Sequence, residues 1–312
     1  MILLTGATGF VGNFLYQQMN YQNIQVKVTI RTEQSAIFFK YPRVVANINE
    51  KTDFSHALVG IDTVIHLAAR VHVMNESSHD PLSEFRLSNV ASTNNLAKQA
   101  ASAGVKRFIF LSSIKVNGES TQSEEKFKPD DIPMPEDAYA ISKMEAETAL
   151  FEIAQETGME VVIIRSPLVY GPGVKANFRS LMTIVSKGFP LPLGAVTANR
   201  RSLVAVDNLV DFIITCISHP AAANQVFLVS DDEDLSTADL LLRMYKANGS
   251  PDRLFRIPLS VIKMFATVMC KKNFYQRLCC SLQVDISKSK QLLQWAPPVS
   301  VDEGLRRAFG KN

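Results

Sequence analysis

Short apolar runs alternate with longer amphipathic patterns along the first half of the chain. The runs are rich in β-branched residues, which indicates buried strands, and they lie at 2–5, 26–30, 62–68, 107–113 and 160–165. Amphipathic periodicity without proline indicates helices at 83–103 and 137–157, and a third such pattern ends at Met19. Because strands that alternate with helices pair in parallel, this half predicts a Rossmann-type, doubly wound parallel sheet.

After Pro167 the regular alternation of strands and helices stops. Two loops rich in glycine and proline follow, YGPGVKANF and KGFPLPLGA, and helical patterns then dominate to the end. We therefore expect an α/β protein with a dinucleotide-binding domain over 1–170, to which 203–230 returns. A smaller, mostly helical substrate lobe is expected from 171–202 and 231–312.

Composition excludes several classes of protein. Of 312 residues, 46% are hydrophobic and 20% charged, which is ordinary for a globular chain, and a net charge of +3 gives no case for a nucleic-acid partner. The four cysteines form no Cys-x-x-Cys, so we expect no metal site, no disulfide framework and a reducing, cytoplasmic location. The start lacks the features of a secretory signal. The apolar run 257–270 is too short to span a membrane, so it predicts a buried helix, with a helix lying on the membrane surface as the alternative.

The stretch TGATGFVG places Gly6, Gly9 and Gly12 between the first strand and the first helix. Glycine lets the backbone turn tightly and approach a pyrophosphate, whose charge meets the helix N-terminus. The loop therefore predicts a dinucleotide site, whereas the alternative is a tight turn in which glycine serves packing alone.

The residue that ends the second strand reads the adenosine ribose in such folds. An acidic residue there would accept a hydrogen bond from the 2′-hydroxyl group, but this chain has Arg31. A guanidinium can pair with a 2′-phosphate, so the sequence favours NADP over NAD. The alternative is a surface arginine that stacks on adenine.

Tyr139 and Lys143 are four residues apart, which is one helical turn, so both side chains lie on one face. A nearby ammonium favours the phenolate, as does an oxidised nicotinamide, and together they are expected to lower the pKa of the tyrosine, which suits proton transfer near neutral pH. Ser112 and Ser113 end a core strand, where ligand-facing residues lie in open α/β sheets. The pair alone could be two ordinary residues of a solvated helix, but the glycine loop, the strand-end serine and the pair together predict an active site.

With these motifs on one chain, the sequence resembles the extended short-chain dehydrogenase/reductases, in particular the NAD-dependent epimerase/dehydratase family. The resemblance also rests on GIDTVIHLAA, NVAST, YAISK, RSPLVYGPG, RRSLVAVDNL and LLQWAPPVSVDEGL, and so covers nearly the whole chain. The run AARVHVM and the run SSIKVNGE look closest to a subgroup that holds UDP-N-acetylquinovosamine 4-dehydrogenases and UDP-glucose 4-epimerases.

The resemblance implies roles for single residues. Tyr139 is the implied acid/base, Lys143 its activator and a ligand of the nicotinamide ribose, and Ser113 the partner of the sugar C4 oxygen. Asn47 stands where an aspartate usually meets adenine. The residues implied to border the cofactor are Gly6, Thr8, Gly9, Phe10, Val11, Gly12, Arg31, Asn47, Ile48, Leu67, Ala68, Ala69, Asn89, Ser112, Tyr139, Lys143 and Pro167.

On the substrate side, the resemblance implies that Asn177 and Arg201 contact the diphosphate or sugar of a UDP-sugar. Arg277 is a second candidate for the phosphates, with a surface role as the alternative, and Arg70 could line the sugar pocket. The polar stretch 119–137 is either a cover over the substrate or a solvated loop.

The residues after Ser113 narrow the reaction. Dehydratases of this family carry an Asp-Glu pair there, and this chain has Ile114 and Lys115, so hydride transfer at C4 is expected. Arg31 favours a UDP-4-keto-6-deoxy-N-acetylhexosamine 4-reductase in surface polysaccharide biosynthesis. The alternatives are a UDP-hexose 4-epimerase and a non-catalytic NADP sensor. The resemblance further implies a homodimer built on 83–103 and 137–157.

Overall fold

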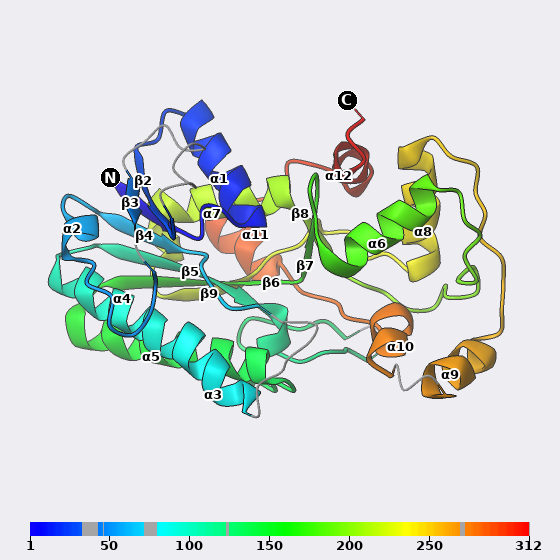
Figure 1. Cartoon of the computed structure of the whole chain (residues 1–312), viewed down its shortest axis with the longest axis horizontal. Coiled ribbons are helices and arrows are strands. Elements are labelled where there is room, and N and C mark those ends of the chain that lie inside the picture. The colour runs from blue at the N-terminus through cyan, green and yellow to red at the C-terminus, as the bar shows by residue number, and fades with distance from the viewer. Residues whose placement is uncertain (33–42, 46, 72–79, 123–124, 269–271, 312) are drawn as a thin grey trace.

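A seven-stranded parallel sheet forms the centre of the computed structural model, which describes residues 1–32, 43–45, 47–71, 80–122, 125–268 and 272–311. Its strand order is β3-β2-β1-β4-β5-β6-β9, and all neighbours are parallel (Figure 1). The strands are β1 (Ile2–Thr5), β2 (Val26–Ile30), β3 (Arg43–Val45), β4 (Thr63–His66), β5 (Arg107–Ser113), β6 (Glu160–Ser166) and β9 (Gln225–Leu228). The predicted Rossmann-type sheet is confirmed, with two further strands, β3 and β9, at its edges.

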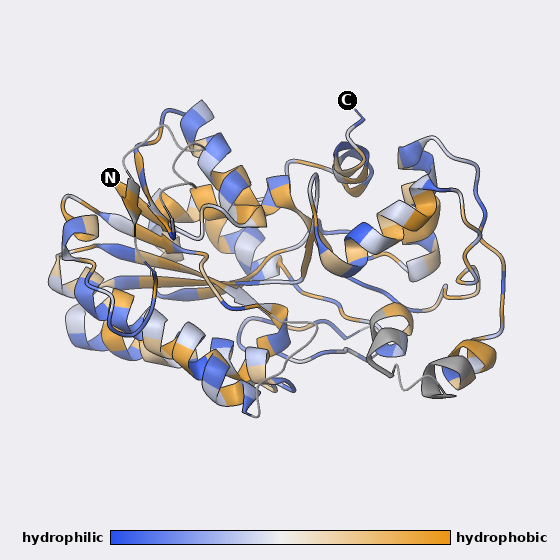
Figure 2. Cartoon of the chain, in the orientation of Figure 1, coloured by the Kyte–Doolittle hydropathy of each residue, from blue (hydrophilic) through white to orange (hydrophobic). Residues whose placement is uncertain are grey.

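Helices cover both faces of this sheet. Figure 1 shows α1 (Phe10–Tyr21), α7 (Val206–Ser218) and α11 (Ser287–Leu293) on one face, and α3 (Pro81–Phe85), α4 (Ser92–Ser102) and α5 (Ala138–Thr157) on the other. Side chains of β5 alternate between the two cores, because Ile109 packs under α1 and α7 while Phe108 and Phe110 face α4 and α5. Apolar residues accordingly concentrate on the strands in Figure 2.

The remaining short elements of this part are α2 (Ser55–Leu58), a π-helix η2 (Arg86–Ala91), and the 3-10 turns η3 (Ile114–Val116) and η4 (Pro220–Ala222). The predicted helix 83–103 therefore corresponds to three consecutive helical elements, α3, η2 and α4. The predicted helix 137–157 is α5, which begins where Asp137 accepts a hydrogen bond from the Ala140 amide at 2.7 Å and ends at Gly158 with φ +75°.

A second cluster of helices lies beyond the carboxyl edge of the sheet (Figure 1). It contains α6 (Ala176–Ser186), α8 (Thr237–Asn248), α9 (Leu259–Val268), α10 (Lys272–Cys279) and α12 (Val301–Ala308), beside the two-stranded sheet β7 (Leu168–Tyr170) and β8 (Leu203–Ala205). Its own core includes Tyr170, Leu241 and Leu305. The boundaries of the two predicted domains stay a prediction. One part of the predicted lobe, the helix α11, packs on the large sheet.

The prediction of a buried helix in 257–270 is wrong for the described part of α9. Leu259 is 37% exposed and Met264 57% exposed, because this helix lies at the outer end of the lobe (Figure 1). Within the described ranges, no helix combines the length and the apolar content that a membrane crossing requires.

Candidate active site

The glycine loop after β1 is shaped by close backbone approach. Gly6 has φ +74°, and a Cβ atom on it would lie 2.7 Å from the Ala68 amide nitrogen. A Cβ atom on Gly12 would lie 2.1 Å from the Gly6 carbonyl oxygen, which also accepts a hydrogen bond from the Gly9 amide at 2.9 Å. No side chain caps the start of α1 at Gly9. The loop thus offers an uncapped helix N-terminus in a cradle that side chains would fill, which fits a pyrophosphate.

The predicted cofactor residues follow six neighbouring strands. Because parallel strands end at one edge, β3, β2, β1, β4, β5 and β6 carry them to the same side of the sheet. Arg31 follows β2 and is exposed, Asn47 and Ile48 follow β3, and Pro167 follows β6. Thr8 and Gly9 follow β1, Phe10 and Val11 begin α1, and Leu67–Ala69 follow β4. Their placement fits a dinucleotide that lies across the edge, and each individual contact stays a prediction.

His66 is the last residue of β4 and lies in the interior next to this edge of the sheet. It is buried, with its Nδ1 atom 2.7 Å from the Thr5 hydroxyl and its Nε2 atom 3.0 Å from the Thr93 hydroxyl. Burial, with a smaller effect of the Lys143 charge, lowers the pKa of His66 to about 3. His66 is thus a neutral interior residue.

Asn89 connects the loop after β4 to α5. Its side-chain amide donates to the Arg70 carbonyl and to the Ser142 hydroxyl, both at 3.0 Å, and its Oδ1 atom accepts from the Arg70 amide at 2.8 Å. Asn89 lies on the π-helix η2, and the extra residue per turn in such a segment is frequent at functional sites. The contact of Asn89 with the loop beside the cofactor edge is consistent with its predicted place.

Ser113, Tyr139 and Lys143 come from the end of β5 and the first turns of α5. The Ser113 hydroxyl accepts a hydrogen bond from the Lys115 amide at 3.3 Å and stays partly exposed. The Tyr139 ring packs edge-on against Phe85, with 6.0 Å between the ring centroids. The Lys143 ammonium donates to the Leu111 carbonyl at 2.8 Å, so β5 and α5 are joined at the site.

Burial, rather than the neighbouring ammonium, dominates the charge states here. It raises the pKa of the Tyr139 phenol, and the Asp137 carboxylate raises it further. Burial lowers the pKa of Lys143 to about 7, partly offset by the Glu147 carboxylate. Without a bound dinucleotide, Lys143 does not bring the pKa of this phenol below its ordinary value, and the predicted lowering by Lys143 together with an oxidised nicotinamide stays a prediction.

A buried ion pair, which the sequence had not predicted, lies behind the site. The Arg165 guanidinium contacts Glu147 through two nitrogens, the closer at 2.7 Å, and both side chains are 5% exposed. Arg165 also donates to the Asn117 side chain at 3.0 Å, and the Ser112 hydroxyl donates to Glu147. The Ser112 hydroxyl proton is thereby used in a hydrogen bond to Glu147 of α5. The four-residue spacing of Lys143 and Glu147 on one helix face was the signal available in the sequence.

Three of the predicted substrate residues, Asn177, Arg201 and Arg277, lie outside the large sheet. Asn177 is exposed in the first turn of α6. Arg201 pairs through its backbone with Leu235 and donates from its guanidinium to the Cys280 carbonyl at 3.0 Å. Arg277 lies on α10, and its side chain is outside the described part of the structure.

Arg70 follows β4 and is partly exposed. Its guanidinium pairs with Glu84 at 3.2 Å and lies over the Phe85 ring, 5.5 Å from the centroid. Phe85 in turn contacts Tyr139. A described chain of contacts through Phe85 therefore joins Arg70 to Tyr139.

The polar stretch after Ser113 is tied to the lobe. The Thr121 amide donates to the Ser281 carbonyl and the Phe127 amide to the Gln283 carbonyl, each at 2.9 Å. The Asp285 amide donates back to the Phe127 carbonyl at 2.8 Å. The stretch 119–137 is thus hydrogen-bonded to the lobe at Thr121 and Phe127, while Ile132 and Met134 are exposed, and its role as a cover or as a solvated loop stays a prediction.

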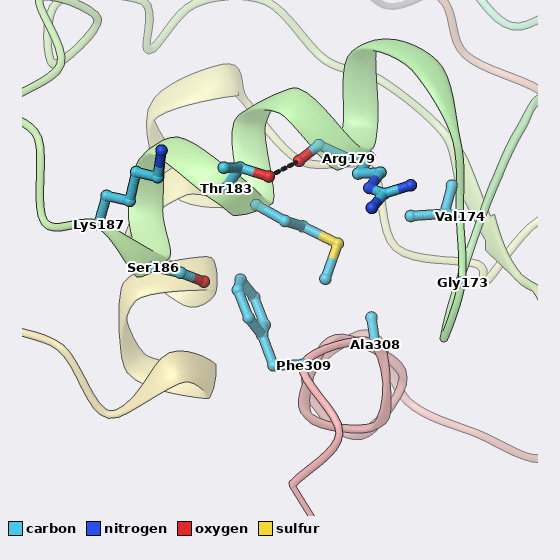
Figure 3. Close-up of a pocket in the computed structure, with 9 residues that line it drawn as sticks. Gly173, Val174, Arg179, Thr183, Ser186, Lys187, Ala308 and Phe309 are labelled. Carbon is cyan, nitrogen blue, oxygen red and sulfur yellow. Dashed lines mark hydrogen bonds between the residues drawn. The ribbon is translucent and has the colours of Figure 1, made fainter.

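A cavity of about 520 Å³ lies between α6 and α12, away from these residues. Figure 3 shows Arg179 and Thr183 of α6 facing Phe309 and Ala308 across it. None of the predicted site residues lines this cavity.

These features define the class of the protein. A Rossmann sheet with a glycine cradle on its first strand, and a serine and a tyrosine at the same edge, is the arrangement of a dinucleotide-dependent enzyme that couples hydride transfer to a proton relay. The sequence model of the NAD-dependent epimerase/dehydratase family matches residues 2–230, and the chain belongs to that family. The family resemblance seen in the sequence is confirmed.

Two curated relatives extend over nearly the whole chain. A UDP-glucose 4-epimerase of Vibrio cholerae is 49% identical over 310 residues, which cover 98% of this chain and 93% of that protein. An N-acetyl-α-D-glucosaminyl-diphospho-ditrans,octacis-undecaprenol 4-epimerase of Escherichia coli O157:H7 is 26% identical over 326 residues, covering 99% and 94%.

Solved structures agree on the fold. A UDP-glucuronic acid 4-epimerase from Bacillus cereus in complex with NAD superposes with a TM-score of 0.79 at 22% identity, covering 99% of this chain and 95% of that one. A UDP-N-acetylglucosamine 4-epimerase from Bacillus cereus gives 0.78 at 19% identity, covering 99% and 94%. At these identities, the likeness shows a shared fold.

Proposed function

We propose that this chain is a UDP-sugar 4-epimerase that uses NAD. The observation that carries the proposal is the 49% identity to a UDP-glucose 4-epimerase along 98% of the chain. The leading prediction, a 4-keto reductase, has less support than its alternative, a 4-epimerase, because this relative and both structural neighbours named above are 4-epimerases. The sugar itself is not identified by these comparisons.

The preference for NADP has less support than the binding of NAD. It rested on Arg31, which the structure places in solvent after β2, where it can equally stack on an adenine ring. The family is described as NAD-dependent, and a neighbour of the same fold was solved with NAD. We therefore propose NAD, held by the glycine loop and the loops after β2, β3 and β4.

In the proposed mechanism, Tyr139 accepts the proton of the sugar C4 hydroxyl and later returns it to the C4 oxygen. Bound NAD supplies the hydride acceptor and donor for C4. Ser113, partly exposed at the end of β5, orients the C4 oxygen through a hydrogen bond. Lys143, held at the Leu111 carbonyl, gains a proton more readily beside a phenolate and so stabilises that form of Tyr139.

Inversion at C4 further requires that the 4-keto sugar presents its other face before hydride returns. The diphosphate has to stay bound while the sugar turns. We propose Arg201 and Asn177 as diphosphate partners, since a guanidinium and a helix N-terminus both suit phosphate oxygens. Arg277 is a further candidate on α10, and Arg70, beside Phe85, is a candidate for the sugar end.

Turnover without added cofactor is the deciding test. The purified protein is incubated with UDP-glucose and with UDP-N-acetylglucosamine, and the products are resolved by proton NMR. We expect the 4-epimer of at least one substrate. Tyr139→Phe is expected to lower kcat by about 100- to 10,000-fold while NAD binding, measured by calorimetry, persists. Tyr21→Phe, which changes an 83% exposed tyrosine of α1, is the matched control and should keep full activity.

The reductase alternative predicts a different outcome. The protein would then leave both UDP-sugars unchanged and would oxidise added NADPH or NADH only when given a UDP-4-keto-6-deoxy-N-acetylhexosamine. That result would contradict the proposed epimerase. A homodimer and a cytoplasmic location, where UDP-sugars and NAD occur together, belong to the same proposal.

A further inference from the structure

Lys115 occupies a position beside Tyr139 that the proposed reaction has not used. It lies on η3, two residues after Ser113, and its side chain is 26% exposed. Its ammonium is 2.6 Å from the Asp137 Oδ2 atom and 2.5 Å from the Glu119 Oε1 atom. These two hydrogen bonds hold the pKa of Lys115 above its ordinary value although burial opposes them. Lys115 is therefore a partly buried cation between two carboxylates.

Asp137 links Lys115 to the start of α5, the helix that carries Tyr139. Its Oδ1 atom accepts the Ala140 amide at 2.7 Å and caps α5, and its Oδ2 atom accepts from Lys115. Tyr139 follows two positions later, and the Asp137 charge disfavours its phenolate. Both oxygens of this carboxylate are thus occupied, one by the helix and one by the ammonium.

We propose that Lys115 is a positioning residue for proton transfer: it fixes Asp137 and offsets its charge, so that Tyr139 can ionise near neutral pH. The inference rests on the proposed role of Tyr139 as acid/base. It assigns a function to a partly buried lysine that the proposed mechanism leaves unused.

Besides Glu119, the second partner of Lys115, other charged groups lie on the elements packed around Tyr139 and stay constant in the test. From α5 these are Lys143 and, two turns on, Glu147; from the loop after β4 and from α3 they are Arg70 and Glu84, which pair at 3.2 Å beside Phe85. An exposed pair, Arg86–Glu145 at 2.6 Å, joins η2 to α5 farther out. A substitution of Lys115 leaves all of these in place.

The test compares pH profiles of kcat for the NAD-loaded protein and its variants. Lys115→Met is expected to move the rising limb to higher pH by about half to one pH unit, so activity falls at pH 7 and recovers in alkali. Asp137→Asn is expected to move it to lower pH, and it preserves the helix cap because asparagine caps as well as aspartate. The double variant should return close to the wild-type profile, and Lys115→Arg should keep it.

A matched control and a direct titration separate this from a folding effect. Lys288→Met removes a lysine that is 22% exposed and paired with Asp130 at 3.3 Å, and it should leave the profile unshifted. A uniform loss of rate in Lys115→Met with no shift, or no recovery in the double variant, would overturn the inference. Tyrosinate formation in the NAD-bound protein, read by ultraviolet difference absorbance against the same variant with Tyr139→Phe, tests the shift even if no UDP-sugar is turned over. An inactive wild type with this shift intact would count against the proposed function alone.

Discussion

Burial decides which side chains carry charge at the edge of the sheet. Lys143 and His66 belong to one connected group, because the Lys143 ammonium lies 4.1 Å from the Phe110 ring centroid and that ring stacks on His66 at 5.8 Å. Removal from water penalises a cation, so the pKa values of both residues are low, about 7 for the lysine and about 3 for the histidine. The lysine can recover its charge when the phenolate forms, whereas the histidine, held by two threonine hydroxyls, stays neutral.

His66 should make the fold sensitive to acid. The unfolded chain binds a proton at His66 below its ordinary pKa of 6.5, and the folded chain does so only near pH 3. Stability is therefore fully present above pH 6.5 and is lost as the pH falls toward 3, by up to about 1.4 kcal/mol per pH unit. His66→Gln should flatten the pH dependence of the free energy of unfolding between pH 6 and 4, measured by urea denaturation.

The control is His56→Gln, which changes an exposed histidine of α2 and should leave the slope as in the wild type. Burial raises the pKa of Asp231 to about 6, so protonation of this carboxyl stabilises the fold as the pH falls, which opposes the His66 effect. This contribution is common to all three proteins and cancels in the comparison. Equal slopes for His66→Gln and wild type would contradict the prediction.

At the scale of elements, the site is assembled where strands end and helices begin. The loop from β1 to α1, the π-helix η2 and the capped start of α5 each place backbone or side chains at the carboxyl edge of the sheet. The loop after β4 is central, because Gly6 lies under its backbone and Asn89 holds it through Arg70. A change in one of these elements should therefore act on cofactor affinity through the position of the others.

Gly6→Ala tests that dependence. A methyl group at Gly6 would lie 2.7 Å from the Ala68 nitrogen, so the two loops must separate. We expect NAD affinity to fall at least about tenfold, measured by calorimetry, together with a loss of stability. Gly104→Ala is the matched control, because its φ of +79° is similar but no atom lies within 4 Å.

That control should cost about 1–2 kcal/mol of stability from the positive φ and leave NAD affinity unchanged. If both variants lower NAD affinity equally, backbone strain rather than the contact with the β4 loop is the cause. If neither does, the glycine cradle is not the place where the dinucleotide binds.

At the scale of the whole molecule, the helices on one face of the sheet form an outer layer. Within the described ranges, no further element packs over the outer side of this layer. The elements α3, η2, α4 and α5 pack against one another on one face of the sheet, and Leu87 of η2 is 49% exposed there. Leu87 would lie in the contact if the proposed homodimer forms through these helices. The proposed homodimer would bury this face against the same face of a second copy.

Leu87→Arg should weaken that dimer, since it places a charge in an apolar contact. Sedimentation velocity at micromolar protein concentration should show a dimer for the wild type and a larger monomer fraction for the variant. Leu292→Arg on α11 changes a 41% exposed leucine outside this layer and should leave the dimer intact. A monomeric wild type would exclude the proposed homodimer.

Much of the sheet could be read from local pattern, because a buried parallel strand is a nearly continuous apolar run. Such runs located β1, β2, β5 and β6 within one residue. The strand β3 has three residues and β9 four, too few for a periodic signal. The Glu147–Arg165 pair was not predicted because it joins a helix to a strand, through a register that pairs Ser112 with Arg165.

By itself the sequence determined the βαβ order and the glycine loop, and it singled out Ser113, Tyr139 and Lys143 as the residues proposed for the chemistry, since these depend on residue type and short spacing. Only the tertiary structure decided which charges meet: Lys115 with Asp137, Arg165 with Glu147, and Lys143 with a backbone carbonyl. It also decided that the Tyr139 phenol is less acidic than its neighbouring lysine suggests. The physical reason is that a pKa depends on how much water the fold removes and on contacts across elements, and neither is encoded in local spacing.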